Sequence, residues 1–563
     1  MKQRRVTVVA SEILGAPGAG GPATADSLLA IALGRRGHDV ELLVAPGREP
    51  GSDERYAESN VRVRALSETT TVQPRFLSPS WHVHEALRAD PPDVVVVDDW
   101  RALGYAALRS RQCGASLAKT AVVLYCHGPA RVFAEAARKV PDTVDRYGEE
   151  VAQRACIELA DAVVSPSRWL VEWLRNHGWP LRDNVRVIQN LWESAALGQP
   201  ARQLGTAGRI RRLVFFGQLR EGKGIRILID ALRRVDGKLL DGVELVFLGH
   251  TRQWPPTRVT EELGPVAQRL ASVRVESSLG RAAAIDELLE PGTLALMPSL
   301  LENSPYAVAE CIEHGVPFLA TAVGGTPELV AEEDRARVLL RPDADEFASA
   351  LTEALQSSDG IAPARPARET EASLAEWIEL VESVEAPNAE VRDSTSAEWV
   401  VVADDGVTQD DGLRDALVAA QASSGADVVT SAVRTNNGVR LFLGDPGPLG
   451  LIENHYGVVG LVRAPLASGN SAWPLFTRIA LDGGRIVSLP RPLATYDGPI
   501  GSIADVAGEG VEILSAWERA GRDPGLAQLA ATLGAQLGRR RREPAAPAGR
   551  LRRLVARAAR RRG

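Results

Sequence analysis

Two acidic residues, Glu302 and Glu310, stand with seven residues between them in the segment MPSLLENSPYAVAECIEHGVPFLATAVGGTPELV (297–330). Ser304 is a suitable N-cap and Pro305 suits the first helical position, so a helix is predicted to begin here, directly after a strand. Amides at such a helix start suit a phosphate or a sugar hydroxyl. The carboxylate of Glu310 can accept two hydrogen bonds from ribose hydroxyls. The alternative is a solvated residue on the outer side of the helix.

Lys223 is a second candidate, in the segment FFGQLREGKG (215–224), where a strand, a glycine and a basic pair precede a helix. The chain has 65 basic residues but only five lysines. A cation is disfavoured at a helix N-terminus, and a bound phosphate reverses that preference. The sequence therefore favours a phosphate contact at Lys223, with a solvated loop lysine as the alternative.

A glycine-rich loop follows the first predicted strand. Gly18, Gly20 and Ala23 satisfy the pattern GxGxxA of dinucleotide-binding proteins, but seven residues separate the pattern from its strand and Pro22 interrupts it. A nicotinamide cofactor is therefore disfavoured. A loop in which Gly20 and Gly21 let the backbone approach a ligand fits better, and a plain flexible loop is the alternative.

The elements that must position these residues are short apolar runs alternating with helical stretches, over residues 1–195 and again after a linker at 198–211. This alternation is typical of parallel sheets covered on both faces, whose ligands bind at the carboxyl ends of the strands. The sequence therefore predicts an α/β fold of two Rossmann-like halves with a cleft between them. The predicted strands are 5–10, 39–45, 93–97, 121–127, 161–167 and 185–190, then 212–217, 243–249, 273–277, 293–299, 317–321 and 337–342.

A polar break at 357–370 precedes a third region, with predicted strands at 398–404, 426–433, 439–444 and 485–490. The segment 538–563 carries eleven Arg and one Glu, so it is +10 while the remainder sums to −17. The acidic body argues against a nucleic-acid partner. The tail predicts contact with an anionic membrane surface, and a disordered solubilising tail is the alternative.

The composition disfavours several classes of protein. No apolar run approaches the ~18 residues of a membrane span, and the N-terminus reads as a strand rather than a signal peptide. The four cysteines form no CxxC pair, which disfavours a disulfide framework and a structural zinc site. We expect a cytoplasmic protein, at the inner face of the membrane if the tail makes its contact.

Taken in order, the motifs resemble those of glycosyltransferase family 4, the retaining enzymes of GT-B fold. The set comprises the EX7E pair with HGVPFLATAVGGTPEL, GQLREGKG, the Gly20-Gly21 loop, His127 after its strand, VSPSRWLVEWLRNHG and VIQN. The resemblance covers about residues 1–355. It implies two facing Rossmann-like domains that bind a nucleotide-diphosphate sugar as substrate, with no cofactor and no metal.

The resemblance also implies roles for single residues. His127 and Glu302 are the expected catalytic residues, beside the transferred sugar. Lys223 would hold the donor diphosphate and Glu310 the ribose hydroxyls. The other expected donor-binding residues are Gly20, Gly21, Gly217, Arg220, Asn303, Ser304, Pro305 and Tyr306. Where the family has Arg directly after the strand glycine this chain has Gln218, and Arg220 is the expected substitute.

Residues 395–500 resemble the later part of family 2 GT-A glycosyltransferases, through EWVVVADDGVTQDDGLRDAL and WPLFTRIALDGGRIVSLPRPLATYDG. Asp404 and Asp405 are present, but Gly406 replaces the second metal-binding acid and Ser471-Ala472 replaces the acidic pair before Trp473. Without those carboxylates a cation site and a general base are missing. We interpret this region as degenerate and non-catalytic, with its aspartates as turn and helix-cap residues.

The expected domains are 1–197 (acceptor), 205–356 (donor), 371–505 (GT-A-like) and 506–563 (helical or disordered tail). The expected activity is metal-independent, retaining transfer of a hexose-type sugar to a glycan or lipid-linked acceptor, in cell-surface polysaccharide or glycoconjugate synthesis. The alternative is a non-catalytic glycan- or nucleotide-sugar-binding scaffold, suggested by Gln218 and the eroded third region.

Overall fold

The computed structural model divides the chain into two compact units, which are described separately. It describes residues 2–16, 18–47, 51–136, 143–204, 208–387, 398–468 and 471–500, and five positions between 513 and 520. The first unit runs to Thr69 and continues with Pro79–Leu108 and Lys119–Pro387; the second comprises Thr70–Ser78, Arg109–Ala118 and the described residues from 398 onward. The segment 538–563, with its predicted membrane contact, lies outside the described residues. Within the described ranges, none of the helices combines the length and apolarity that a membrane span requires.

The first half of the first unit is built on a seven-stranded sheet in the order β3-β2-β1-β5-β6-β7-β8, with every pairing parallel. Its strands are β1 (Arg5–Ala10), β2 (Asp39–Val44), β3 (Val61–Ala65), β5 (Val94–Asp98), β6 (Ala121–Tyr125), β7 (Ala162–Ser165) and β8 (Val185–Val187). Its helices are α1 (Gly21–Arg35), α2 (Glu54–Glu58), α3 (Ser78–Ala89), α4 (Tyr105–Gln112), α5 (Ala130–Ala136), α6 (Val144–Leu159), α7 (Arg168–Asn176) and α8 (Glu193–Leu197). The predicted strands are confirmed. Strand β3 was missed because it lies at the sheet edge and alternates Val with exposed Arg.

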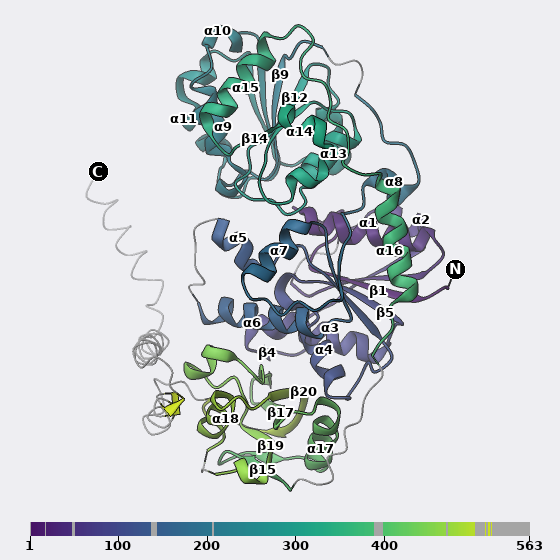
Figure 1. The fold of residues 1–563 in the computed structure, drawn as a ribbon, viewed down its shortest axis with the longest axis vertical. Coiled ribbons are helices and arrows are strands. Elements are labelled where there is room, and N and C mark those ends of the chain that lie inside the picture. The colour runs from purple at the N-terminus through teal and green to yellow at the C-terminus, as the bar shows by residue number, and fades with distance from the viewer. Residues whose placement is uncertain are drawn as a thin grey trace, which may run out of the picture. The chain divides into compact units, whose positions relative to one another are not determined.

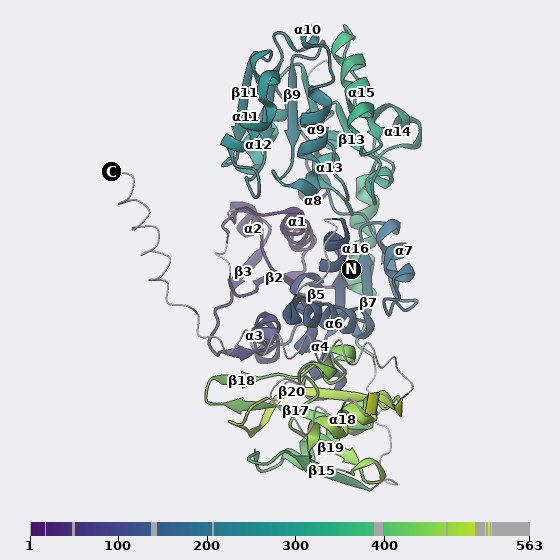
Figure 2. The same ribbon diagram turned by 90° about the vertical axis from the view of Figure 1, so that its left-hand side faces the viewer.

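The second half has a six-stranded parallel sheet in the order β11-β10-β9-β12-β13-β14. Its strands are β9 (Arg212–Phe216), β10 (Glu244–Leu248), β11 (Ser272–Glu276), β12 (Thr293–Met297), β13 (Phe318–Thr321) and β14 (Leu339–Leu340). Its helices are α9 (Ile225–Leu232), α10 (Gly237–Leu240), α11 (Pro256–Leu263), α12 (Arg281–Leu288), α13 (Tyr306–Glu313), α14 (Glu332–Val338) and α15 (Ala344–Gln356). Helices α9, α11 and α15 pack on one face of the sheet and α12, α13 and α14 on the other, which explains the continuous apolar strands (Figure 2).

Helix α16 (Thr370–Ser383) follows the second half in the sequence but packs on the first. Leu374, Trp377 and Leu380 enter the same apolar core as strands β1 and β6 (Figure 1). The third region was predicted to begin at residue 371. The structure instead places α16 in the first unit, because its apolar side is buried there.

The second unit contains a mixed sheet in the order β15-β19-β17-β18-β4, with β20 pairing to β17 and β16. Its elements are β4 (Val72–Gln73), β15 (Trp399–Ala403), β16 (Thr408–Gln409), α17 (Leu413–Ser424), β17 (Val428–Thr435), β18 (Gly438–Arg440), β19 (Val459–Arg463), α18 (Ala472–Leu481) and β20 (Ile486–Thr495). Strand β4 comes from the N-terminal part of the chain, which the sequence did not indicate. The GT-A likeness of this unit stays a prediction.

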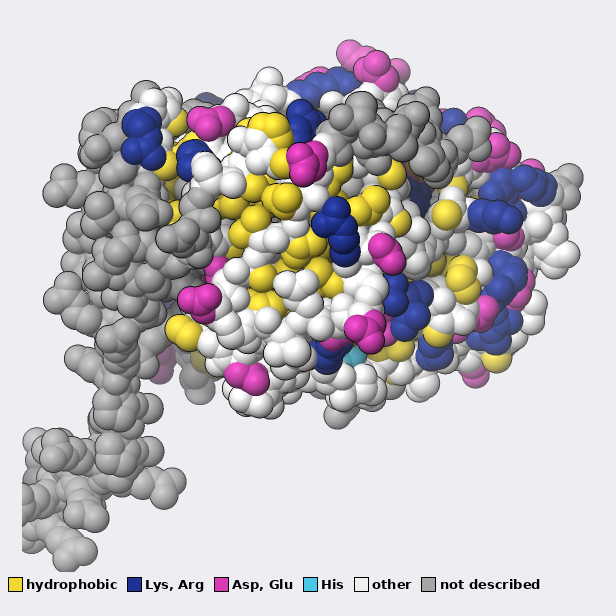
Figure 3. Space-filling view, turned by 90° about the horizontal axis from the view of Figure 1, so that it is seen from below, with side chains coloured by type: hydrophobic (Ala, Val, Ile, Leu, Met, Phe, Trp, Pro, Cys, Tyr) yellow, Lys and Arg dark blue, Asp and Glu magenta, His cyan; other side chains and the backbone are white. Residues whose placement is uncertain are grey.

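Asp404, at the end of β15, accepts a hydrogen bond from the backbone N–H of Ala472 at 2.7 Å. It thus caps the start of α18, in agreement with the interpretation of this aspartate as a cap residue. Strand β15 is the sheet edge and four of its five residues are half-buried. The face drawn in Figure 3 carries apolar side chains near its centre, with charged side chains around them.

Candidate functional site

The segment from Glu302 to Glu310 comprises the end of the loop after β12 and the first residues of α13. The helix begins at Tyr306, and Pro305 before it has φ −72° and ψ 117° without a side-chain capping bond. The prediction that Ser304 caps this helix and Pro305 opens it is therefore wrong by one residue. The carbonyl of Ser304 instead accepts a hydrogen bond from the amide of Asn190, at 3.3 Å, so the first half holds this turn.

Asn303 joins the two halves of the first unit. Its side-chain amide donates to the carbonyl oxygen of His127 at 3.0 Å, and its Oδ1 accepts from the hydroxyl of Ser167, which also caps α7. Asn303 is 6% exposed, so these bonds satisfy a buried polar group. The EX7E segment therefore lies against the residue that follows β6, and the predicted catalytic residues His127 and Glu302 come from neighbouring backbone.

Lys223 forms an ion pair with Glu302. Lys223 is the last residue of a short 3-10 turn, Glu221–Lys223. The carboxylate of Glu302 also accepts a hydrogen bond from the hydroxyl of Ser299 at 2.6 Å. The side chains of Lys223 and Glu302 are 21% and 13% exposed. The alternative of a solvated loop lysine is therefore wrong, and the pairing of two predicted site residues was missed by sequence reasoning.

The loop that carries Lys223 has a fixed path. Gly224 has φ +71°, and a Cβ there would lie 1.7 Å from the carbonyl oxygen of Pro298, so only glycine fits. Glu221 accepts the indole N–H of buried Trp254 at 3.2 Å and pairs with Arg226. These contacts hold both ends of the turn and so hold the lysine between them.

Arg220 stands out among the arginines of this loop. Its Nε atom is buried without a hydrogen-bond partner, and no carboxylate among the described residues pairs with its guanidinium. On the facing side, Glu12 accepts the N–H of Gly20 at 3.0 Å, and a Cβ on Gly20 would lie 4.0 Å from the amide nitrogen of Gln218. A Cβ on Gly21 would lie 3.7 Å from the ring of Tyr306. The structure thus brings together the loops that follow β1, β9 and β12, as the prediction required.

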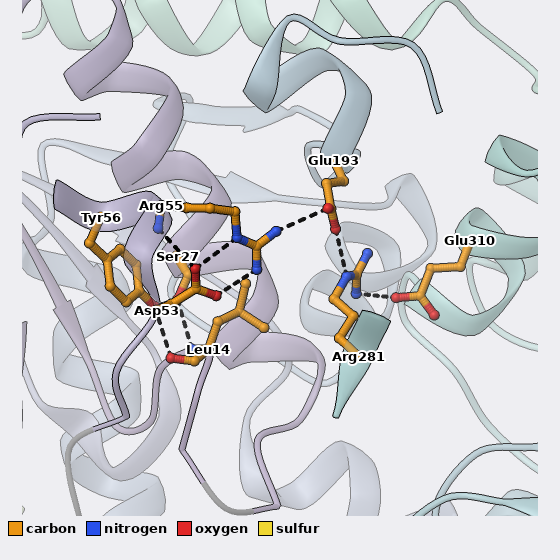
Figure 4. A network of polar contacts seen from close by, with 8 residues as sticks. All are labelled: Leu14, Ser27, Asp53, Arg55, Tyr56, Glu193, Arg281 and Glu310. Atoms are coloured by element: carbon orange, nitrogen blue, oxygen red, sulfur yellow. Dashed lines mark hydrogen bonds and ion pairs between the residues drawn. The ribbon is translucent and has the colours of Figure 1, made fainter. Parts of the chain in front are cut away.

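Glu310 is 6% exposed and forms an ion pair with Arg281, the first residue of α12 (Figure 4). The alternative of a solvated helix residue is therefore wrong. Burial raises the pKa of Glu310, and the charge of Arg281 opposes that rise. Arg281 also donates to Glu193, at the start of α8.

Asp99 organises the turn that contains His127. Its carboxylate accepts the backbone N–H of His127 at 2.9 Å, the N–H of Gly128 at 3.1 Å and the thiol of Cys126 at 3.2 Å. The imidazole Nε2 of His127 lies 3.4 Å from Oδ1 of Asp26, on α1. Neither aspartate was predicted as a site residue. The only signal was a carboxylate in an otherwise apolar helix and another at a strand end.

The family model described as Glycosyltransferase Family 4 matches residues 19–191, and the model described as Glycosyl transferases group 1 matches residues 210–357. Together they match more than half of the chain. The chain belongs to glycosyltransferase family 4. Its two parallel sheets are accordingly the Rossmann-like domains of a GT-B glycosyltransferase, and the GT-B part of the predicted fold class is confirmed.

Individual relatives of this glycosyltransferase are distant. The alpha-maltose-1-phosphate synthase of Mycolicibacterium smegmatis is 28% identical over 221 residues, which cover 36% of this chain and 55% of that protein. The chain thus spans about half the length of that relative. The structure of Anabaena HepE in complex with UDP and glucose aligns with a TM-score of 0.46 at 16% identity, over 69% of this chain and 96% of that one. Sucrose-phosphate synthase from Thermosynechococcus elongatus aligns with a TM-score of 0.46 at 19% identity, over 67% and 94%.

Burial changes the pKa values of the acidic side chains near His127 in this glycosyltransferase. Burial, with smaller contributions from Asp99 and Glu12, raises the pKa of Asp26 well above its usual value. Burial also raises the pKa of Asp98 and of Asp99. The pKa of the His127 imidazole is lowered by burial, which Asp99 and Asp98, at the end of β5, oppose. Among the described residues, no group of three or more His, Cys, Asp or Glu side chains is arranged to hold a metal ion.

We predict that Asp26→Asn makes stability less sensitive to pH. Because the folded pKa of Asp26 is raised, this group stabilises the fold below its unfolded pKa of about 4, and that contribution is lost as pH rises through the folded pKa. The wild-type free energy of unfolding should therefore fall more steeply between pH 5 and 8 than that of the variant. Urea denaturation measures both slopes, with exposed Asp359→Asn as the control. Equal slopes for wild type and Asp26→Asn would contradict the prediction.

Proposed function

We propose that this chain is a retaining glycosyltransferase that moves a hexose-type sugar from a nucleotide-diphosphate sugar to a glycan or glycolipid acceptor. The observation that carries the proposal is the hydrogen bond from Asn303 to the carbonyl of His127, at 3.0 Å. It places the segment with Glu302 and Glu310 against the residue after β6, where strand ends of both sheets meet. Ligands of parallel α/β sheets bind at such carboxyl ends.

The donor diphosphate is proposed to lie at the loop 217–224. Lys223 offers a compact ammonium there, and Arg220 offers a guanidinium that no described carboxylate neutralises. When the diphosphate takes the place of Glu302 as the partner of Lys223, the two cations can balance its charge without a metal or another cofactor. The charge that is missing because Gln218 stands in place of the family's arginine is then supplied by Arg220. The backbone at Gly20, Gly21, Gly217 and at Asn303–Tyr306 completes the proposed donor contacts.

The reacting sugar is proposed to lie between Glu302 and His127. The bond from its anomeric carbon to the diphosphate oxygen breaks, and a bond from the acceptor oxygen forms on the same face. The acceptor proton passes to the departing diphosphate, so the protein supplies no nucleophile. Lys223 and Arg220 stabilise the charge that develops on the leaving group, and the protein contributes mainly orientation. The name of the mycolicibacterial relative, a maltose-phosphate synthase, supports a hexose-type sugar.

We predict that Lys223→Ala and Arg220→Ala each weaken binding of a nucleoside diphosphate by about tenfold or more, since each removes a charge-assisted contact of ~1.5–3 kcal/mol. Isothermal titration with UDP, ADP and GDP measures this. Lys238→Ala, an exposed lysine on α10, is the matched control and should bind as the wild type does. Unchanged affinity in both test variants would sink the assignment of the diphosphate site.

A turnover experiment separates the enzyme from the non-catalytic scaffold, which remains the second candidate because Gln218 departs from the family pattern. Glu302→Gln removes the carboxylate beside the sugar but leaves Lys223 free for the diphosphate. It should lose ~100-fold or more in nucleotide-sugar turnover while retaining nucleoside-diphosphate affinity. Release of nucleoside diphosphate from a panel of nucleotide sugars, with and without acceptor glycans, measures turnover. Binding without turnover in the wild type across the panel would favour the scaffold.

The acceptor is proposed to be reached at the cytoplasmic face of an anionic membrane. The support is the +10 charge of residues 538–563 in an otherwise acidic chain. The full chain should therefore co-sediment with phosphatidylserine-containing liposomes, and a chain ending at Leu537 should bind much less. Neutral liposomes are the control. Equal binding of the two chains would remove this part of the proposal.

A further inference from the structure

A row of alternating charges runs from the proposed donor site into the first half of the fold (Figure 4). Glu310 pairs with Arg281, whose Nε donates to Glu193 at 2.7 Å. The other oxygen of Glu193 accepts from Arg55 at 2.9 Å, and Arg55 in turn holds Asp53 through two bonds of 2.8 and 2.6 Å. Each charge in the row has an opposite charge on at least one side.

Arg281 is the residue on which this row depends. Its guanidinium forms ion pairs with two carboxylates, those of Glu310 and Glu193, and its side chain is only 18% exposed. Although burial opposes the charged form, Glu310 and Glu193 raise the pKa of Arg281, so it stays a cation. The fixed planar donors of arginine suit such a fork, whereas lysine provides a single charge centre.

The Glu310 carboxylate is held by one oxygen. Among the described residues, Arg281 engages Oε1 and no side chain or backbone group bonds to Oε2. An ionised carboxylate has about four acceptor positions, so one guanidinium leaves room for two hydroxyl donors. The contact with Arg281 therefore orients Glu310 without using up its acceptor capacity.

We propose that Arg281 is a positioning residue for donor binding: it fixes Glu310 by one oxygen for the ribose hydroxyls and links that carboxylate, through Glu193, to Arg55 in the first half. The proposal rests on the proposed function, because it assigns Glu310 to the ribose. It adds that Arg55, which lies outside the donor domain, contributes to nucleotide affinity.

Charges on several elements make this role necessary. Glu310 faces Glu193 from α8, Glu313 and Tyr306 from its own helix and His314 just beyond it, and Arg281 is the cation from α12. Without Arg281, the buried Glu310 would lie beside Glu313 and the half-buried Glu193 with no arginine paired to it. Like charges favour the protonated form, and a protonated Glu310 accepts fewer hydroxyl bonds.

The experiment is titration of UDP, ADP and GDP, and of inorganic pyrophosphate, into the full chain and its variants at pH 6.5, 7.5 and 8.5. Arg281→Ala should lose tenfold or more in nucleoside-diphosphate affinity at pH 6.5 and recover part of it at pH 8.5. Pyrophosphate lacks ribose, so its affinity should not change. Arg281→Lys should restore affinity in part, because it returns the charge but not the fork. Arg202→Ala removes a surface pair to Asp286 on the same helix and is the matched control.

The link to the first half is tested by a double-mutant cycle. Arg55→Ala should weaken nucleoside-diphosphate binding two- to fivefold in the wild type and not further in Arg281→Ala. Circular dichroism checks folding. If Arg281→Ala does not fold, the single variants Arg281→Lys and Glu193→Gln replace it in the titration. Wild-type affinity and pH dependence in the Arg281 variants, or tighter binding, would overturn the inference. If Lys223→Ala and Glu310→Gln weaken binding in the same assay, the proposed function survives that failure; if they do not, the donor site itself is wrong.

Discussion

The burial of two carboxylates in one short segment is the constraint on which the site depends. Glu302 and Glu310 are mostly shielded from water, and an unpaired buried charge costs several kcal/mol. Lys223 compensates one and Arg281 the other, so the loop after β9 and the start of α12 must both lie against the segment. Electrostatic compensation therefore fixes the positions of three separate elements, and it does so with groups that a charged ligand can also bind.

Several polar groups join the two halves of the first unit, beside apolar contacts of Trp192 and Tyr306. Asn303 bonds to the His127 carbonyl and to Ser167, and Glu328 accepts the backbone N–H groups of Arg168 and Trp169 at 2.8 Å each. Glu328 thus caps helix α7 of the first half from the second half. Hydrogen bonds of this kind are directional, so they specify which strand ends face each other. Apolar packing, which each half uses for its own core, is not directional and would specify this less well.

Sequence periodicity predicted the sheets because a strand covered on both faces must be apolar throughout. For Glu310 it left a ligand contact and a solvated position open, since a helical pattern shows only which side faces the sheet. The structure covers the other side with α8 and α12. The partners Arg281 and Glu193 carry no local pattern, because an ion pair between distant residues has no sequence period. Asp26 was recoverable in principle, as a carboxylate within an apolar helix, but its proximity to His127 needed the fold.

The third region shows why sequence order is a poor guide to what can be separated. Val72 pairs with Val439 in the sheet of the second unit, and Cys113 enters its apolar core. The backbone carbonyl of Gln112 accepts the hydroxyl of Ser423 at 3.1 Å. Removing the region would expose these N-terminal residues, because their partners lie in it. The region therefore has a structural role in covering these residues, whether or not it has the acids for metal chemistry.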